Sequence, residues 1–364
     1  MSDKSAKRCY IGVMSGTSLD GVDVVLCPVG EDGIELAASL SYPFDNALKE
    51  DILRVIGGTT TLREVGGIDH RLGELFADAV QTLIGQYALD TGRIEAVGLH
   101  GQTLWHQPEG GAPFTMQLGD PNIVCARTGI KTVADFRRKD MAFGGQGAPF
   151  APAFHRFLFE KLEGRTVVVN IGGMANITVI GEPLLGFDTG PGNVLMDGWC
   201  REKFGILFDS EGAIAQRGEV DEAMLEAMLG DAYFARPAPK STGREHFNAE
   251  WMDGFLKTGT RNDAVLATLT ELTARSIADA AKAYAPKRLL LCGGGAKNVF
   301  LRGRIASMLD GVEVVRTDEY GVSGDWMEAM AFAWLAFKRL NEEAVGLKSV
   351  TGASQNTILG GIYA

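Results

Sequence analysis

The chain has 364 residues, of which 46% are hydrophobic and 22% are charged, and this size and composition predict a globular protein of two domains. Its formal net charge of −11 argues against a non-specific nucleic-acid binder, which would need a basic surface. The five cysteines form no C-x-x-C pair, and there is neither a long apolar run nor a signal-peptide pattern. We therefore expect a cytoplasmic protein with no zinc site, no disulfide framework and no membrane span.

Strands and helices alternate along the first part of the chain. Two apolar runs, Tyr10–Val13 and Val22–Leu26, predict the strands of a hairpin. Apolar residues at helical spacing predict an amphipathic helix over Gly73–Leu89. Short strands are predicted at Ala96–Leu99 and Ile130–Ala134.

The turn of the first hairpin is the most distinctive segment, and Gly12–Asp23 reads GVMSGTSLDGVD. Gly16 and Gly21 permit backbone angles that are closed to other residues, and they let a ligand approach the main chain. Such a turn can present N–H groups to an anion without a lysine, and it is not a Walker A loop because no Gly-Lys-Ser/Thr follows. An ordinary glycine hairpin is the alternative interpretation.

A second hairpin repeats this pattern after the glycine-rich run Gly144–Pro149, which is the best candidate for a domain boundary. Its strands are predicted at Thr166–Ile171 and Ile177–Ile180, around the turn Gly172–Asn176. Both halves then contain a strand, a glycine turn, a strand and later a helix, which indicates a weak internal repeat.

The later elements continue the alternation of strands and helices. Helices are predicted near Val194–Arg201 and over Ala264–Tyr284, and a strand is predicted at Arg288–Leu291. A last helix is predicted over Asp325–Leu340, with its first residue at the cap position and Glu328 completing a capping box. This order of elements predicts the α/β class.

Four polar glycine turns follow strands, at Ser15–Asp23, Gly172–Asn176, Asp188–Asn193 and Gly293–Ala296. In open α/β sheets, ligands bind at the carboxyl ends of the strands. Together the turns favour a nucleotide held in a cleft between the two halves, whereas each one alone is also consistent with a tight reverse turn.

Two carboxylates are candidates for chemistry. Asp188 follows an apolar run, where its side chain can bind a water or hydroxyl and accept a proton. The alternative for Asp188 is a helix N-cap, a position that favours aspartate. For Glu328, the alternative is the third-residue partner in a capping box.

Basic residues offer weaker signals. Arg137 and Arg138 follow a predicted strand and can bind an anion, although a solvated surface pair is the common outcome for such residues. His100 and His106 are six residues apart, which is not the spacing of a helical metal pair, so we predict neither as a metal ligand. The metal ligands stay unassigned.

These motifs together resemble one family, the bacterial anhydro-N-acetylmuramic acid kinases. The similarity runs from about Tyr10 to Tyr363, nearly the whole chain. Seven motifs in order carry it: Gly12–Asp23, Leu99–Thr103, Asp135–Arg137, Gly144–Pro149, Asn170–Asn176, Phe187–Asn193 and Gly293–Ala296.

The resemblance implies an α/β fold of two duplicated actin-like (ribonuclease H-like) ATPase lobes around a nucleotide cleft. We expect the N-terminal lobe over residues 1–140, with residues 345–364 returning to it, and the C-terminal lobe over residues 141–344. The implied reaction uses ATP, Mg²⁺ and water to convert 1,6-anhydro-N-acetylmuramic acid to N-acetylmuramic acid 6-phosphate in peptidoglycan recycling.

The resemblance also implies site residues. Asp188 matches the catalytic base, which would deprotonate the water that attacks C1 and opens the anhydro bridge. The residues assigned to ATP are Gly16, Thr17, Ser18, Leu19, Asp20, Gly21, Val22, Asp23, Gly172, Gly173, Asn176, Gly293, Gly294 and Gly295, the last three against the adenosine. The residues assigned to the substrate are Arg137, Glu328, His100, Gly101 and Gln102.

Two other functions remain open at this point. A kinase of another anhydro-sugar, such as levoglucosan, would keep the phosphate turns and Asp188 but lack a pocket for the lactyl and acetamido groups. An actin-like ATPase switch or chaperone would hydrolyse ATP slowly without sugar and would need a peptide-binding segment. The expected partner is a small sugar, with no nucleic acid and no membrane, and a homodimer is left open.

Overall fold

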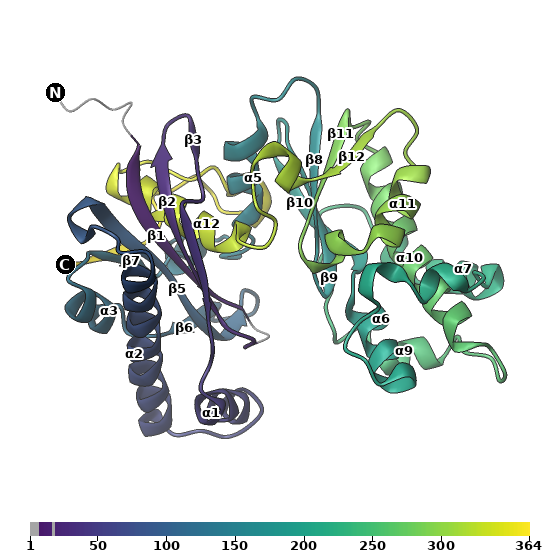
Figure 1. The fold of residues 1–364 in the computed structure, drawn as a ribbon, viewed down its shortest axis with the longest axis horizontal. Coiled ribbons are helices and arrows are strands. Elements are labelled where there is room, and N and C mark those ends of the chain that lie inside the picture. Colours follow the sequence, from purple (N-terminus) through teal and green to yellow (C-terminus); the bar gives the residue numbers. More distant parts are fainter. Residues whose placement is uncertain (1–6, 17–18) are drawn as a thin grey trace. The chain divides into compact units, whose positions relative to one another are not determined.

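The computed structural model describes residues 7–16 and 19–364, so Thr17 and Ser18 of the predicted phosphate turn lie outside the described residues. The chain forms two compact units (Figure 1). Unit 1 combines Met1–Leu158 with Trp326–Ala364, and unit 2 is Phe159–Asp325.

The sheet of unit 1 is mixed, with the strand order β13-β7-β5-β1-β2-β3, while β4 pairs with β2 and β6 pairs with β5. The first two strands form the predicted hairpin, in which Ser15 pairs with Val22 at the turn. The strands are β1 (Arg8–Ser15), β2 (Val22–Gly30), β3 (Gly33–Ile34), β4 (Ala38–Tyr42), β5 (Ile94–Gln107), β6 (Phe114–Leu118), β7 (Thr132–Ala134) and β13 (Gly361–Tyr363).

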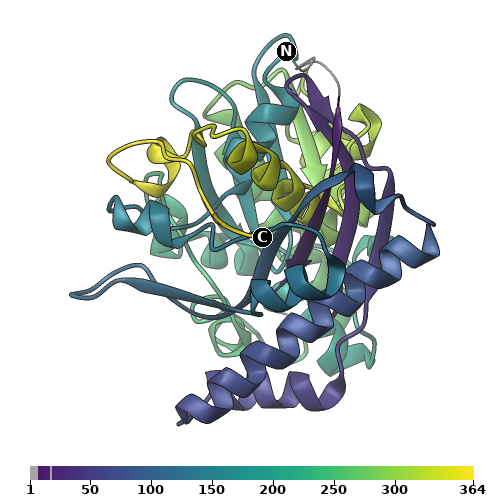
Figure 2. The same ribbon diagram turned by 90° about the vertical axis from the view of Figure 1, so that its left-hand side faces the viewer.

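The helices of unit 1 cover both faces of this sheet. Because side chains alternate along a strand, Ile11 and Val13 pack in one core with α2, which runs across the sheet in Figure 2. On the opposite face, Gly12 and Gly98 lie against the backbone of α12. The helices are α1 (Asn46–Ile56), α2 (Leu62–Gln86), α3 (Pro121–Thr128), α4 (Arg138–Ala142), α5 (Ala151–Phe159), α12 (Met327–Leu340) and α13 (Lys348–Thr351).

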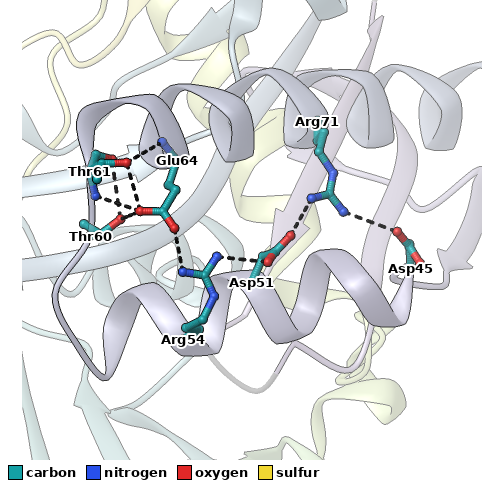
Figure 3. Close-up of polar contacts among 7 residues, drawn as sticks. All are labelled: Asp45, Asp51, Arg54, Thr60, Thr61, Glu64 and Arg71. Atoms are coloured by element: carbon teal, nitrogen blue, oxygen red, sulfur yellow. Dashed lines mark hydrogen bonds and ion pairs between the residues drawn. The ribbon is translucent and has the colours of Figure 1, made fainter.

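Helix α2 begins eleven residues earlier than the sequence pattern predicts, because Thr61 and Glu64 form a capping box at its start. The exposed Gly66 and Gly67 weaken the helical signal there. Ion pairs tie the first three turns of α2 to α1: Arg54 donates to Glu64 at 2.7 Å, and Arg71 donates to Asp51 at 2.6 Å (Figure 3).

Unit 2 is built around a second mixed sheet, with the strand order β10-β9-β8-β11-β12. One face is covered by the long helix α10, whose apolar side packs with β8 and β9 in a single core. The elements are β8 (Thr166–Ile171), β9 (Met174–Val179), β10 (Leu185–Pro191), α6 (Val194–Trp199), α7 (Glu222–Leu229), α8 (Ala232–Ala235), α9 (Ala249–Asp253), α10 (Asn262–Lys282), β11 (Arg288–Cys292), α11 (Val299–Ser307) and β12 (Glu313–Arg316).

The two sheets share a core of five strands with the same order and directions, which confirms the predicted α/β class and supports the internal duplication. In unit 1, β4, β2 and β1 are antiparallel neighbours, and β5 and β7 follow in parallel. In unit 2, β10, β9 and β8 are antiparallel neighbours, and β11 and β12 follow in parallel. This is the ribonuclease H-like order expected for an actin-type lobe, found twice. Within the part of the chain that the structure describes, no helix is both long and apolar enough to cross a bilayer.

The unit boundaries differ from the predicted lobes. Residues 141–158 and 326–344 were expected in the C-terminal lobe but belong to unit 1. The Gly144–Pro149 run is not a linker, because the buried Asp140 carboxylate accepts a hydrogen bond from Gly147 N–H at 2.8 Å and one from Thr351 Oγ1 at 2.9 Å. These bonds hold the run against the C-terminal segment of the same unit.

Candidate active site

Three of the sequence motifs meet in unit 1, at the end of β1, in the middle of β5 and just after β7. Ser15, the last residue of β1, donates from Oγ to Gln102 Oε1 at 2.5 Å. His100 Nδ1 lies 3.2 Å from the Ser15 carbonyl, and Arg137 Nη2 lies 2.9 Å from His100 Nε2. The predicted substrate residues His100, Gln102 and Arg137 are therefore linked to Ser15, where the predicted phosphate turn begins.

These contacts define the protonation state of His100. An arginine can only donate, so Nε2 of His100 accepts from Arg137 and Nδ1–H donates to the Ser15 carbonyl. Burial, followed by the positive charge of Arg137, lowers the pKa of His100 to about 3. The imidazole is neutral at physiological pH and is not a general acid there.

We expect His100→Gln to reduce the loss of stability on acidification. Below about pH 6.5 the unfolded chain binds a proton at this histidine, but the folded protein does not until about pH 3, so stability falls as the pH falls through this window. Between pH ~6.5 and pH ~5, His100 lowers the free energy of unfolding of the wild type by about 2 kcal/mol. Urea unfolding of the wild type and of His100→Gln at pH ~7.5 and pH ~5 measures this fall in the free energy of unfolding. An equal fall in both proteins would contradict a buried neutral histidine.

Arg137 is not half of a solvated surface pair. Its Nη1 donates to the Gly147 carbonyl at 2.8 Å, and its guanidinium lies 4.7 Å from the centre of the Phe150 ring. Burial lowers the pKa of Arg137 to about 10, which leaves it charged at neutral pH. Arg138 is the exposed member of the pair, and its Nε lies 3.5 Å from an Asp135 carboxylate oxygen.

The predicted capping box at the start of α12 is wrong. The helix begins at Met327, its N-cap is Trp326, and no side chain caps it. Asp325 instead pairs with Lys297 at 2.8 Å. The carboxylate of Glu328 is solvent-exposed yet recessed among protein atoms, and this desolvation raises its pKa while the charge of Arg137 lowers it. The capping alternative for Glu328 therefore fails.

The first turn itself combines burial and exposure. The side chain of Leu19 is buried in the core of unit 1 and its φ is 55°, whereas Asp20 is exposed. Gly101 has a φ of 79°, and a Cβ there would stand 2.8 Å from the Leu118 carbonyl oxygen, so this position requires glycine for packing. A pocket of about 370 Å³ opens beside it, lined by His100, Gly101, Asp120, Asp135, Arg138 and Tyr363 among others.

Three glycine turns converge in unit 2, as their places after strands predict. A Cβ at Gly192 would overlap the Gly172 carbonyl, and one at Gly293 would overlap Asn170 Oδ1. The N–H groups of Asn193 and Val194 donate to the carbonyls of Gly172 and Gly173. The Gly293–Ala296 segment forms a short 3₁₀ turn (Gly294–Lys297) in place of an open loop.

The N–H of Gly173 is one of the open donors at this junction. Gly172 N–H is taken by the Met174 carbonyl at 3.2 Å, but Gly173 N–H has no acceptor among residues 7–16 and 19–364. The half-buried turn around Gly172 and Gly173 also has room in front of it, because a Cβ at either residue would have its nearest neighbour at 3.6 Å or beyond. An N–H without an acceptor in a glycine turn is a donor of the kind that binds anions.

Asp188 lies within β10, opposite Asn176 of β9, and is not a helix cap. The N-cap of the following helix is Asn193, so the capping alternative for Asp188 is excluded. Burial raises the pKa of Asp188, the Thr242 N–H opposes this shift, and the negative charge of Glu245 adds to it. Oδ2 accepts from Thr242 N–H at 3.0 Å, while Oδ1 has no donor among the described residues and can accept a proton from a ligand.

Sequence reasoning missed the segment that holds Asp188. The Asp188 N–H donates to the Lys240 carbonyl at 3.0 Å, and the Tyr233 hydroxyl donates to the Asp188 carbonyl at 2.7 Å. Thr242 is 54 residues away in the chain, so no local pattern links it to Asp188. The only local signal was a polar run after Pro239 with a glycine in it.

Among the residues that the structure describes, no group of three or more histidine, cysteine, aspartate or glutamate side chains gathers as a metal site. A cation that takes most of its ligands from phosphates and water does not need such a group.

Comparisons with known proteins agree with the motifs. The family model described as anhydro-N-acetylmuramic acid kinase matches residues 8–364. A relative of that name from Sulfurovum sp. is 55% identical over 360 residues, covering 98% of this chain and 99% of the relative. Another, from Sulfurimonas denitrificans, is 49% identical over 363 residues, covering 97% and 99%. Among solved structures, component A of (R)-2-hydroxyglutaryl-CoA dehydratase from Acidaminococcus fermentans has a TM-score of 0.48 at 12% identity, covering 92% of this chain and 99% of that one.

Proposed function

The chain belongs to the anhydro-N-acetylmuramic acid kinase family, and from this premise we propose how its residues divide the work of the reaction. The enzyme is a phosphotransferase that opens the 1,6-anhydro ring of anhydro-N-acetylmuramic acid and phosphorylates O6. One water adds across the C1–O6 bond, and the freed O6 takes the γ-phosphoryl group of ATP. ADP leaves with the bridging oxygen, and one proton is released.

Asp188 is the proposed base that takes the proton from this water. Its Oδ2 is held by the Thr242 N–H, so Oδ1 is the oxygen that would receive the proton. Because the backbone N–H and carbonyl of Asp188 are both bonded, the carboxylate is anchored on a rigid strand. A raised pKa brings a carboxylate closer to the operating pH, which makes it a better base.

The glycine turns are the proposed ATP site. The Gly16–Asp23 turn of unit 1 would contribute backbone N–H groups to the phosphates, and Gly172, Gly173 and Asn176 would do the same from unit 2. The open N–H of Gly173 supports this assignment. Gly293, Gly294 and Gly295 are proposed to lie against the adenosine, since a glycine turn lets a flat ring approach the main chain.

Mg²⁺ fits this donor set. The ion binds through one or two carboxylates and the substrate phosphates, and keeps several waters. Asp20 and Asp23 are the carboxylates of the first turn, and one of them would supply that ligand. When bound, the ion neutralises charge on the β- and γ-phosphates.

The substrate residues are proposed to act through two features of unit 1. His100 and Gly101 line the pocket of about 370 Å³, which is large enough for an amino sugar. Arg137, Gln102 and His100 form one hydrogen-bonded group with Ser15, so Arg137 would orient polar substrate groups from a fixed position. Glu328, with a carboxylate free of any capping role, is the proposed acceptor for sugar hydroxyls.

A coupled assay of ADP release tests the function. With ATP and Mg²⁺, we expect rapid ADP release with 1,6-anhydro-N-acetylmuramic acid and a product whose mass equals substrate plus water plus a phosphoryl group. Levoglucosan should react poorly, because it lacks the lactyl and acetamido groups. Equal or faster turnover of levoglucosan would assign a different sugar, and ADP release that ignores both sugars would favour an ATPase switch.

A further inference from the structure

The segment from Lys240 to Phe247 in unit 2 is anchored at both ends. The Lys240 carbonyl accepts from Asp188 N–H, and its ammonium donates to the Tyr233 and Phe234 carbonyls, each at 3.1 Å. At the other end, the Phe247 ring is fully buried in the core of the unit. Between these anchors, Thr242 N–H holds the Asp188 carboxylate, so the backbone of the segment is held close to Asp188.

Arg244 lies between these two anchors and is the exposed cation of the segment. Its Nη2 lies 3.8 Å from the point where a Cβ on Gly173 would stand. Its guanidinium therefore lies over the same turn that leaves the Gly173 N–H open. An N–H donor and a cation that share one turn make a site for an anion.

No carboxylate neutralises Arg244 among the residues that the structure describes. The positive charges of Arg201 and Arg244 both act on Asp197 of α6, but Asp197 forms no ion pair with either arginine. The backbone carbonyl of Arg244 accepts from Asn248 Nδ2 at 3.2 Å, so the main chain at this residue is tied down while its guanidinium stays available.

We propose that Arg244 binds the γ-phosphoryl group of ATP during its transfer to O6 and is a catalytic residue of the reaction. This inference rests on the proposed function. In the transfer, the bond from the γ-phosphorus to the ADP bridging oxygen breaks, and its electron pair leaves with ADP. The bond from phosphorus to O6 forms, while negative charge spreads over the equatorial phosphoryl oxygens. A guanidinium donates two parallel N–H bonds to such oxygens, which an ammonium cannot reproduce.

Arg244→Gln and Arg244→Lys test this role, with Arg261→Gln as the matched control. Arg261 is an exposed arginine of the same unit that pairs with Asp263 on the surface, so its loss should leave activity unchanged. We expect Arg244→Gln to lower kcat by roughly 10³-fold, with the KM for the sugar changed much less. Arg244→Lys should recover only part of the rate. All three variants should unfold at the wild-type temperature.

A second readout does not use the sugar. The affinity of the protein for ADP, Mg²⁺ and aluminium fluoride, which together mimic the transferring phosphoryl group, should fall by at least about 100-fold in Arg244→Gln. The affinity for ADP alone should change little. Equal affinity of the wild type and the variant for the fluoride complex would overturn the proposal.

The remaining outcomes separate the two hypotheses. A variant whose KM for the sugar rises while kcat is kept would place Arg244 on the sugar and overturn its assignment to the phosphoryl group. A wild-type enzyme that does not phosphorylate the anhydro-sugar contradicts the proposed function. In that case the fluoride measurement still shows whether Arg244 recognises a transferring phosphoryl group.

Discussion

Asp188→Asn is expected to abolish turnover while leaving the fold and ATP binding intact. The amide is nearly isosteric and can still accept from Thr242 N–H, but it cannot take a proton from water at neutral pH. General-base catalysis typically raises a rate roughly 10²–10⁴-fold, so we expect kcat to fall by a factor of this size or more. The measurements are steady-state ADP release, ATP affinity and melting temperature.

The raised pKa of Asp188 adds a second expectation. Because the base must be ionised, the rate should fall as the pH drops through the raised pKa, at a higher pH than an ordinary aspartate would give. Asp279→Asn, on an exposed surface of α10, is the control and should retain full activity. Near-wild-type turnover by Asp188→Asn, with unchanged stability, would end its assignment as the base.

Gly12→Ala should destabilise unit 1 strongly, although it adds one methyl group. The new Cβ would overlap the Ala329 carbonyl oxygen, and main chain cannot rotate away as a side chain can. Overpacking of this kind costs about 3 kcal/mol. For a unit of this size, that corresponds to a fall in melting temperature of roughly 6–12 °C, measured by calorimetry or circular dichroism.

Gly85→Ala is the matched control for this substitution. Gly85 lies in α2, where a Cβ would meet nothing within 4 Å, and alanine is the better helix former by about 1 kcal/mol. Gly85→Ala should therefore keep or raise the melting temperature. An equally stable Gly12→Ala protein would mean that α12 does not pack against β1, and the assignment of residues 326–344 to unit 1 would fail.

Local sequence determined both hairpins, the strands β5, β7 and β11 in part, and the helices α2, α6, α10 and α12 in part. Valine and isoleucine runs on either side of a glycine turn form a hairpin through neighbouring residues, which is why both hairpins lie where they were predicted. The convergence of the three glycine turns of unit 2 follows from their predicted places after strands, whereas Asp188, predicted to follow a strand, lies within β10. The seven family motifs, taken in order, predicted the enzymatic activity.

Contacts between distant residues decided the rest, and no local pattern encodes them. The helix that starts near Asp325 has a capping box in its sequence, but packing of α12 against Gly12 and Gly98 sets its start and its unit. The Gly144–Pro149 run has the composition of a linker, yet the Asp140 carboxylate binds both Gly147 of this run and the distant Thr351, which ties the run into unit 1. Arg244 lies near the Gly172–Gly173 turn only through the tertiary fold, because the two are some seventy residues apart in the chain and no local pattern links them.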